Sequence, residues 1–299
     1  MATLAPRAVV VSRRSELDEL LIRHGTRAAA GFFLKQRGRS MEEVEQRHST
    51  LEHALNSVSA AMPGDWRRGH VDRDDLPRFL FAPEDIVITV GQDGLVANAA
   101  KYLSGQPVVG VNPEPAWNPG VLARFDSSLL GELLPRVAAG RAAIQSRTMV
   151  VATLDDGQRL CGLNEIYIGH SSHQSSRYLL SPPGGRLERH SSSGVVVGTG
   201  TGATGWCVSI AGERGLLEEL PAPHDAALCW FVREAWPSPA TGVALTTGRI
   251  GPGEQLGITS ESERLVAFAD GVETDHLVLA WGQQVQISLA PQHLNLVIP

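Results

Sequence analysis

A strand, a glycine turn and a helix follow one another between Ile86 and Leu103, and this segment constrains the fold most. The β-branched run Ile86–Val90 leads into Gly91-Gln92-Asp93-Gly94, and the alanine-rich stretch Val96–Leu103 has helical character. Such a turn presents backbone N–H groups and a helix N-terminus to a phosphate. An aspartate there would repel the phosphate unless it held a metal or took a proton from a hydroxyl. The segment points towards phosphoryl transfer, with a plain βα turn and a solvated Asp93 as the alternative.

The first part of the chain alternates strand-like and helix-like segments. Short apolar runs predict further strands at Ala8–Val11 and Pro107–Asn112. One helix is expected to begin at the N-cap Ser15, and two others to span Met41–Ala61 and Ser127–Ala139. Alternation of this kind predicts a parallel sheet with helices on its faces.

The pattern changes from about Ala142, where glycine and proline turns separate short strands and few helical patterns intervene. The expected strands are Thr148–Leu154, Cys161–Ile168, Val195–Val197, Ala226–Phe231, Leu265–Phe268, His276–Ala280 and Val285–Leu289. Packed antiparallel sheets fit this pattern. We therefore expect an α/β domain over residues 1–140, which carries the Gly91–Gly94 turn, and an all-β domain over 141–299. A return of the last segment to the first domain stays open.

The net charge, the apolar runs and the cysteines limit which partners and which cellular compartment are expected. A formal net charge of -6 argues against a nucleic-acid backbone as the main partner. No apolar run approaches the ~20 residues needed to span a membrane, and the N-terminal residues lack an apolar core of signal-peptide length. The three cysteines are odd in number and form no Cys-x-x-Cys pair, so neither a disulfide framework nor a zinc site is expected. A reducing cytoplasm fits best.

A second glycine cluster, Gly198–Gly205, follows the apolar run Val195–Val197. Gly200 to Gly205 matches the dinucleotide fingerprint G-x-G-x-x-G. A Rossmann fingerprint should open a βαβ unit, however, and this one lies among antiparallel strands. We expect instead a turn whose backbone N–H groups and threonine hydroxyls contact a polar ligand.

Three other polar groups have competing interpretations. Asn164-Glu165 interrupts an apolar stretch, and from local sequence alone a bulge or strand end with solvated side chains is favoured over a grip on two ribose hydroxyls. His170 and His173 lack a third nearby ligand and are expected to face solvent, so no metal-ligating residue is predicted. Asp270-Gly271 indicates a turn between strands.

Taken in order, these segments resemble the motifs of the NAD kinase family, especially its mitochondrial-type branch. The resemblance spans roughly Asp85 to Leu289. The matching segments are Gly91-Gln92-Asp93-Gly94, Val108–Pro115, Leu163–Gly169, Ser192–Trp206 and Phe268–Gly271. Several ordered motifs with similar separations are far more specific than any one of them.

The resemblance implies an α/β domain, an all-β domain, and a nucleotide cleft between them. It also implies transfer of the ATP γ-phosphoryl group to the 2′-hydroxyl of the NAD adenosine ribose, with Mg²⁺ bridging the phosphates. Asp93 would orient and deprotonate the hydroxyl, amides of Gly91 and Gly94 would hold phosphate oxygens, and Asn164 and Glu165 would clamp ribose hydroxyls. The remaining implied binding residues are Gln92, Thr199, Gly200, Thr201, Gly202 and Thr204. Assembly into a homodimer or higher oligomer through the all-β domain is implied as well.

The chain departs from the family pattern at several positions. Gln92 replaces the second glycine of the first motif, and Leu95 replaces a hydroxyl residue. Gly200 replaces a common proline, and Gly205-Trp206 replaces Ala-Tyr. Two alternatives to an NAD kinase therefore stay open: a kinase of the same fold that acts on another hydroxyl of a nucleoside, sugar or lipid, and a non-catalytic protein that senses NAD or NADP.

Overall fold

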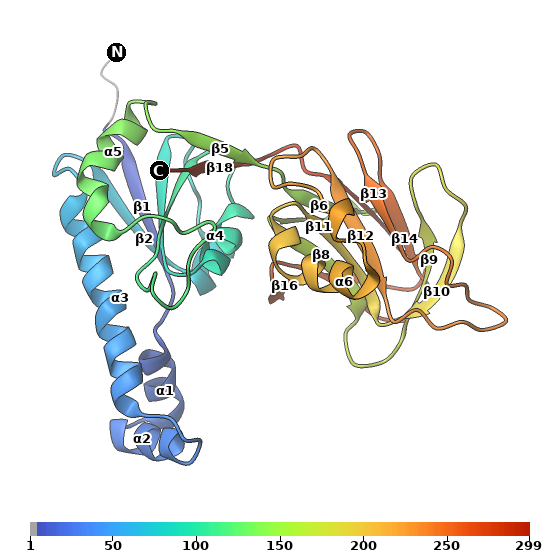
Figure 1. Ribbon diagram of the computed structural model, residues 1–299, viewed down its shortest axis with the longest axis horizontal. Helices are drawn as coiled ribbons and strands as arrows, with labels where there is room; N and C mark the ends of the chain where they lie inside the picture. Colours follow the sequence, from blue (N-terminus) through green and yellow to red (C-terminus); the bar gives the residue numbers. More distant parts are fainter. Residues whose placement is uncertain (1–4) are drawn as a thin grey trace. The chain divides into compact units, whose positions relative to one another are not determined.

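The computed structural model describes residues 5–299 (Figure 1). The chain folds into two compact units. One comprises the residues up to Gln145 together with Asn295–Pro299, and the other comprises Ser146–Leu294. The last strand therefore returns to the first unit. Within the described residues, no helix combines the length and the apolar character that a bilayer span requires.

A six-stranded, mostly parallel sheet organises the first unit. The strand order is β2-β1-β3-β4-β18-β5. The strands are β1 (Arg7–Ser12), β2 (Arg67–Asp72), β3 (Asp85–Val90), β4 (Pro107–Val111), β5 (Ile144–Arg147) and β18 (Leu294–Val297). β1 pairs in parallel with both β2 and β3, and β4 pairs in parallel with β3 and β18. Every residue of β3 is buried, as expected for a central strand covered on both faces.

Among residues 5–145, five α-helices and two 3-10 segments complete this unit. They are α1 (Glu16–His24), α2 (Arg27–Lys35), α3 (Met41–Ala61), α4 (Asp93–Ala100), α5 (Leu130–Ala138), η1 (Arg73–Arg78) and η2 (Ser127–Leu129). Ser15 caps α1 through a capping box with Asp18, because each residue's side chain accepts from the other's backbone N–H. Figure 1 shows α1 and α2 beside the end of α3 that lies away from the sheet.

The core of the first unit lies between the sheet and the helices α3 and α5. Ile88 and Val109 of the sheet are fully buried against Val58 of α3 and Leu134 of α5. Burying each such side chain stabilises the fold by ~1.5 to 3 kcal/mol. This packing holds the carboxyl ends of β1, β3 and β4 at one edge of the sheet.

Two six-stranded antiparallel sheets form the second unit. One has the order β10-β9-β14-β17-β6-β7, and the other has the order β13-β12-β11-β8-β15-β16. The first sheet contains β6 (Val150–Leu154), β7 (Arg159–Gly162), β9 (Ser176–Ser181), β10 (Glu188–Ser192), β14 (Leu256–Ser260) and β17 (Gln284–Leu289). The second contains β8 (Glu165–His170), β11 (Gly194–Thr199), β12 (Leu228–Arg233), β13 (Thr247–Ile250), β15 (Leu265–Ala269) and β16 (Val272–Leu279). Both contribute to one apolar cluster, so the sheets pack face to face.

One α-helix, α6 (Trp206–Arg214), and the 3-10 segments η3 (Gly202–Thr204) and η4 (Leu217–Glu219) accompany these sheets. Cys207 and Ile210 of α6 pack against Val196 of β11 and Phe231 of β12. The helix therefore covers the face of the second sheet that does not meet the first sheet. It begins immediately after the second glycine cluster.

The expected fold class is confirmed, and so are the Ser15 N-cap and the Met41–Ala61 helix. Several elements differ from the prediction. Cys161–Ile168 is not one strand, because β7 ends at Gly162 and β8 begins at Glu165. The helix after the first glycine turn begins at Asp93 rather than Val96. The prediction also missed several elements: α2, β2, β5, β9, β10, β13, β14, β18 and α6. In β2, the first four residues are polar or glycine and are not buried.

Candidate active site

The first glycine turn lies at the carboxyl end of β3 and at the start of α4. The Gly91 N–H donates to the carbonyl oxygen of Val111, the last residue of β4, at 2.9 Å. This bond links the turn to the sheet. The Gly91 N–H is therefore already used within the protein, and its contact with a phosphate stays a prediction. The first N–H groups of α4 have no partner within the helix, and they lie at the positive end of its dipole. Gly94 belongs to this first turn and stays a candidate phosphate contact.

Asp93 is tied to the segment that follows β4. Its Oδ1 accepts the N–H groups of Leu122 (2.9 Å) and Ala123 (2.8 Å), and its Oδ2 accepts the N–H of Val121 (2.8 Å). Each carboxylate oxygen has two lone pairs, so Oδ1 is saturated and Oδ2 keeps one free. Asp93 therefore positions a loop and retains a single acceptor site for a hydroxyl proton.

The two unusual residues of this turn have different environments. Leu95 is 4% exposed, and its Cδ2 would lie 3.1 Å from a Cβ on Gly91, so it fills the core under the turn. Gln92 is exposed and occupies the N-cap position of α4 without a side-chain capping bond. Its amide is therefore available for contacts outside the turn.

In the second unit, Asn164 and Glu165 form the corner between β7 and β8. Asp270, in the turn between β15 and β16, holds this corner. Its carboxylate accepts the N–H groups of Leu163 (2.8 Å), Asn164 (2.7 Å) and Glu165 (3.3 Å). The Asp270 N–H in turn donates to the Glu165 carbonyl oxygen at 3.1 Å. The strand end expected at Asn164-Glu165 is confirmed, but both side chains are half-buried rather than solvated.

Thr199, the last residue of β11, connects this corner to the second glycine cluster. Its N–H donates to the Asn164 carbonyl oxygen (2.9 Å), and its hydroxyl donates to the Leu163 carbonyl oxygen (2.6 Å). The same hydroxyl accepts the N–H groups of Thr201 (3.0 Å) and Gly202 (3.2 Å). The loop after β11 is therefore fixed against the Asn164-Glu165 corner.

Two glycines of this loop lie too close to neighbouring backbone to carry a side chain. A Cβ on Gly202 would lie 2.1 Å from the Asn164 carbonyl oxygen, and one on Gly200 would lie 1.9 Å from that of Ala222. The departure at Gly200 is thus explained by steric contact. The G-x-G-x-x-G match is not a Rossmann fingerprint, because β11 pairs antiparallel with both β8 and β12.

The two remaining threonines differ in how their hydroxyls are used. The Thr204 hydroxyl donates to the Thr201 carbonyl oxygen at 2.9 Å. The Thr201 hydroxyl oxygen is buried and has no hydrogen-bond partner within residues 5–299. An unpartnered buried hydroxyl costs free energy. The oxygen has no accessible surface in this conformation, so a ligand contact of Thr201 stays a prediction.

Burial raises the pKa of Glu165 to about 7, and the negative charge of Asp270 acts in the same direction. The carboxyl group therefore titrates near neutral pH. In its ionised form it accepts two hydrogen bonds from hydroxyl groups, and in its protonated form it accepts them less strongly.

The structure brings together Asn164, Glu165, Thr199 and the loop Gly200–Thr204 in the second unit, while Gly91–Gly94 lies in the first. Asp270 was not among the site residues predicted from the sequence. The sequence did show Asp270-Gly271 as a turn between strands. It did not show that this turn contacts Asn164, because that contact depends on which strands are neighbours in the sheet. Nowhere in residues 5–299 do three or more His, Cys, Asp or Glu side chains form a metal-binding cluster.

The sequence is similar to several proteins named NAD kinase, although no family model matches it. The Chlorobaculum tepidum protein is 25% identical over 71% of this chain and 71% of its own length. The Chlorobium limicola protein is 28% identical over 54% of this chain and 55% of its own length. The Clostridium tetani protein is 28% identical over 64% of this chain and 68% of its own length.

Among solved structures, yeast NADH kinase complexed with NADH has a similar fold. The alignment covers 100% of this chain and 84% of the yeast chain, with a TM-score of 0.62 and 14% identity. The mitochondrial-type branch stays a prediction, because neither comparison distinguishes it. The sequence comparisons support a kinase related to the NAD kinase family, and the structural comparison shows that the chain has the fold of an NADH kinase.

Proposed function

We propose that this protein transfers the γ-phosphoryl group of ATP to the 2′-hydroxyl of the adenosine ribose of NAD, which gives NADP and ADP. One observation carries the proposal. Asp270 and Thr199 hold the Asn164-Glu165 corner by its backbone, while the side chains of Asn164 and Glu165 have no hydrogen-bond partner within the described residues. Two free polar groups on a rigid corner suit a vicinal diol such as a ribose.

Asp93 is the proposed proton acceptor. As the 2′-oxygen forms its bond to the γ-phosphorus, the bond from that phosphorus to the β,γ-bridging oxygen breaks, and ADP leaves. The hydroxyl proton passes to Oδ2 of Asp93, which has the free lone pair, while the three backbone amides fix the carboxylate. Gln92 and Gly94 offer N–H donors to the phosphate oxygens.

The proposed reaction uses Mg²⁺ to neutralise the phosphates of the donor. Magnesium commonly binds through substrate phosphates, waters and one or two carboxylates, and it needs no protein cage. The free lone pair on Oδ2 of Asp93 is assigned to the hydroxyl proton, so Mg²⁺ would be held by the donor phosphates and by water.

The decisive experiment incubates the full chain with ATP, Mg²⁺ and NAD, and measures NADP with an NADP-specific dehydrogenase. NADH, a nucleoside, a sugar and a diacylglycerol serve as parallel acceptors, and polyphosphate as a parallel donor. NADP formation above that of the Asp93→Asn variant supports the proposal. Phosphorylation of another acceptor without NADP would identify instead a kinase of the same fold that acts on another hydroxyl. Gln92 and Leu95 favour this alternative and the sensor equally.

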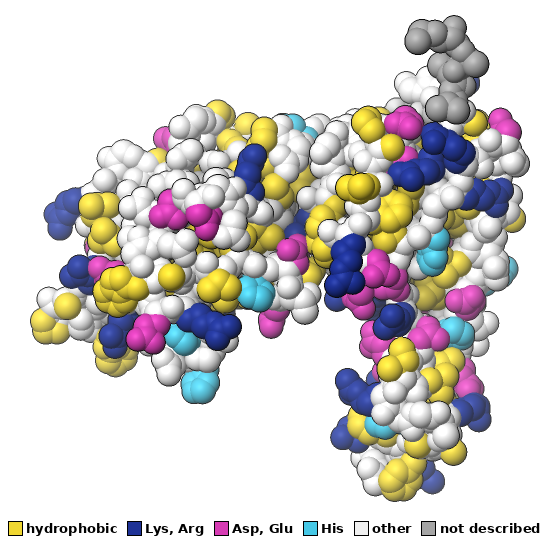
Figure 2. All heavy atoms as spheres, turned by 180° about the vertical axis from the view of Figure 1, so that it is seen from behind, with side chains coloured by type: hydrophobic (Ala, Val, Ile, Leu, Met, Phe, Trp, Pro, Cys, Tyr) yellow, Lys and Arg dark blue, Asp and Glu magenta, His cyan; other side chains and the backbone are white. Residues whose placement is uncertain are grey.

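Binding of NAD without phosphorylation of any acceptor would favour the sensor. The sequence has three cysteines and no Cys-x-x-Cys pair, which supports a reducing compartment, and we propose the cytoplasm. Figure 2 shows acidic and basic side chains interspersed over one face, which fits a small-molecule substrate better than a nucleic-acid backbone.

A further inference from the structure

The carboxyl ends of β1 and β3 meet at a point where the chain changes direction across the sheet. From β1 the chain crosses to β2 on one side, and β3 lies on the other side of β1. Ligands of open parallel sheets bind outside the strand ends at such a switch point. A recess of about 110 Å³ opens here, lined by Arg13 and Arg14 after β1 and by Gly91 and Gln92 after β3.

Two of the arginines that line this recess, Arg13 and Arg14, have no acidic partner among the described residues. Glu16 is paired with Arg39, and Glu114 is paired with Arg47 at 3.6 Å. Arg13 and Arg14 are exposed and have no ion pair or side-chain hydrogen bond within residues 5–299. Two unpaired guanidinium groups beside the N-terminus of α4 favour a phosphate chain.

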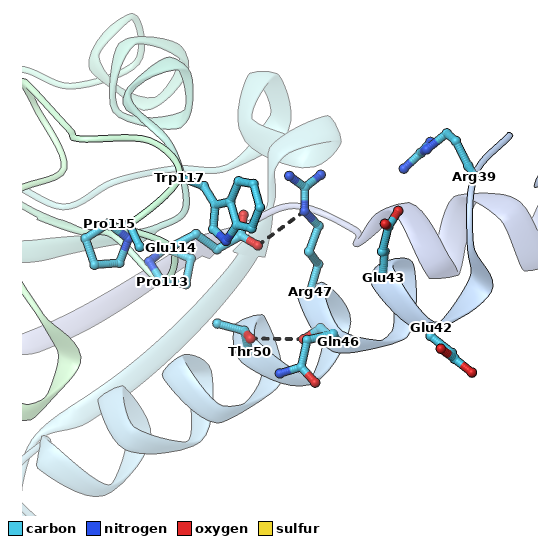
Figure 3. A pocket seen from close by; sticks show the side chains of 11 residues that line it. Arg39, Glu42, Glu43, Gln46, Arg47, Thr50, Pro113, Glu114, Pro115 and Trp117 are labelled. Atoms are coloured by element: carbon cyan, nitrogen blue, oxygen red, sulfur yellow. Dashed lines mark hydrogen bonds and ion pairs between the residues drawn. The ribbon is translucent and has the colours of Figure 1, made fainter.

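A larger cavity of about 800 Å³ adjoins the recess and shares Arg47, Pro113 and Glu114 with it. In Figure 3, Trp117 and the neighbouring prolines lie opposite α3, and Glu114 points toward Arg47. The Trp117 side chain is 76% exposed at this cavity. Arg39 and Arg47 also line the cavity, but each has a carboxylate partner. By contrast, Glu42 and Glu43 have no ion pair in the part of the chain that the structure describes. The lining therefore suits a neutral group better than a phosphate. An open indole face is a stacking surface for an aromatic base.

We propose that these adjoining cavities seat the phosphoryl donor as a nucleoside triphosphate, with its phosphates at Arg13, Arg14 and Gln92 and its base on Trp117. The inference rests on the proposed function for the role of this ligand as donor. It places the entire donor seat on the first unit. It also gives a role to Gln92, which stands where the family motif has glycine. The side-chain amide of Gln92 donates to a phosphate oxygen, whereas a glycine could donate only its backbone N–H.

The test measures binding to the full chain by calorimetry, without NAD, using four probes: Mg²⁺-ATP, tripolyphosphate, adenosine and inorganic phosphate. Replacing both arginines (Arg13→Gln with Arg14→Gln) should weaken ATP and tripolyphosphate binding by about tenfold or more and leave adenosine unchanged. Trp117→Leu should weaken ATP and adenosine by about tenfold and leave tripolyphosphate unchanged. Arg136→Gln and Trp281→Leu, at exposed positions outside both cavities, are the matched controls.

Unchanged ATP affinity in the double arginine variant would overturn the proposal, as would equal losses in the control variants. If the double arginine variant loses tripolyphosphate binding but Trp117→Leu binds ATP and adenosine as wild type does, the stacking of the base on Trp117 is wrong. If ATP binds as expected but no NADP forms, the donor seat stands and the acceptor assignment fails. If NADP forms, the double arginine variant should have a raised KM for ATP and an unchanged KM for NAD. A raised KM for NAD with an unchanged KM for ATP would contradict the donor site.

Discussion

The carboxylate of Asp270 accepts a hydrogen bond from the backbone N–H of Asn164, 106 residues earlier in the chain, at 2.7 Å. The same carboxylate also accepts from Leu163 and Glu165. Asp270 therefore acts as a positioning residue, because it fixes the backbone from which Asn164 and Glu165 present their side chains.

Asp270→Asn should weaken NAD binding and lower the melting temperature together. An amide offers one acceptor oxygen where the carboxylate offers two, and its NH₂ group would face backbone N–H groups. We expect a loss of ~1 to 3 kcal/mol in the free energy of unfolding. Asn164→Ala removes only the proposed ribose contact, so it should weaken NAD binding by ~1 to 2 kcal/mol with little change in melting temperature. Calorimetry and thermal melts separate the two effects, and a large melting shift in Asn164→Ala would identify that side chain as structural.

Glu165→Gln should change how stability depends on pH. The raised pKa of Glu165, about 7 against 4.5 for an ordinary glutamate, means that the folded state holds its proton more tightly than the unfolded state. Its contribution to stability is therefore fully present below about pH 4.5 and is lost as pH rises through about 7. Relative to the glutamine variant, wild type should lose about 3 kcal/mol over this window, as measured by urea titration.

The same titration should affect ligand binding with the opposite sign. The ionised Glu165 carboxylate accepts hydroxyl hydrogen bonds more strongly than the acid does. NAD affinity of wild type should therefore rise as pH passes through about 7, and the rise should be absent in Glu165→Gln. A parallel pH profile in both proteins would assign the effect to another group.

Asp93→Asn should lower phosphoryl transfer by ~10² to 10⁴, the usual cost of losing a general base. The three backbone N–H groups on its carboxylate add a structural cost, since the variant's NH₂ group would oppose at least one of them. We expect a loss of ~1 to 3 kcal/mol in the free energy of unfolding. Turnover is measured below the variant's melting temperature, and retention of more than about a tenth of wild-type activity would exclude Asp93 as the base.

Gln92→Gly tests whether the glutamine, which replaces a glycine of the family motif, has a function or is merely tolerated. If the exposed amide of Gln92 holds the donor, glycine should weaken tripolyphosphate binding and raise KM for ATP, with KM for NAD unchanged. If Gln92 is merely tolerated, glycine should keep or raise NADP formation, because backbone could approach phosphate more freely. Absence of NADP synthesis in both proteins, with NAD still bound, would favour the sensor.

The second unit carries exposed apolar side chains, and we expect the protein to be a homodimer or a higher oligomer. Trp236 and Trp281 are 69% and 68% exposed, and Leu187 and Val278 are exposed as well. Burial of such residues between two copies would stabilise an assembly. Light scattering at micromolar concentration should give at least twice the 32.0 kDa chain mass, and a monomer mass would contradict this expectation.

Local sequence determined much of the first unit. The apolar run at β3 and the uninterrupted helix Met41–Ala61 follow from periodicity, and the Ser15 cap follows from residue chemistry. The glycine turn and the Asn164-Glu165 corner were also readable, because polar residues and glycines interrupted regular patterns there. β2 was not, since its largely polar sequence has no period to detect.

Tertiary structure alone decided how these pieces work. Asp93 meets Val121–Ala123, and Asp270 meets Leu163–Glu165, through hydrogen bonds that depend on strand order rather than sequence spacing. The use of the Gly91 N–H by Val111 has the same origin. The Glu165 pKa depends on burial and on a charge from another strand turn. Periodicity reports which face of an element is buried, but it carries no information on which distant element covers that face.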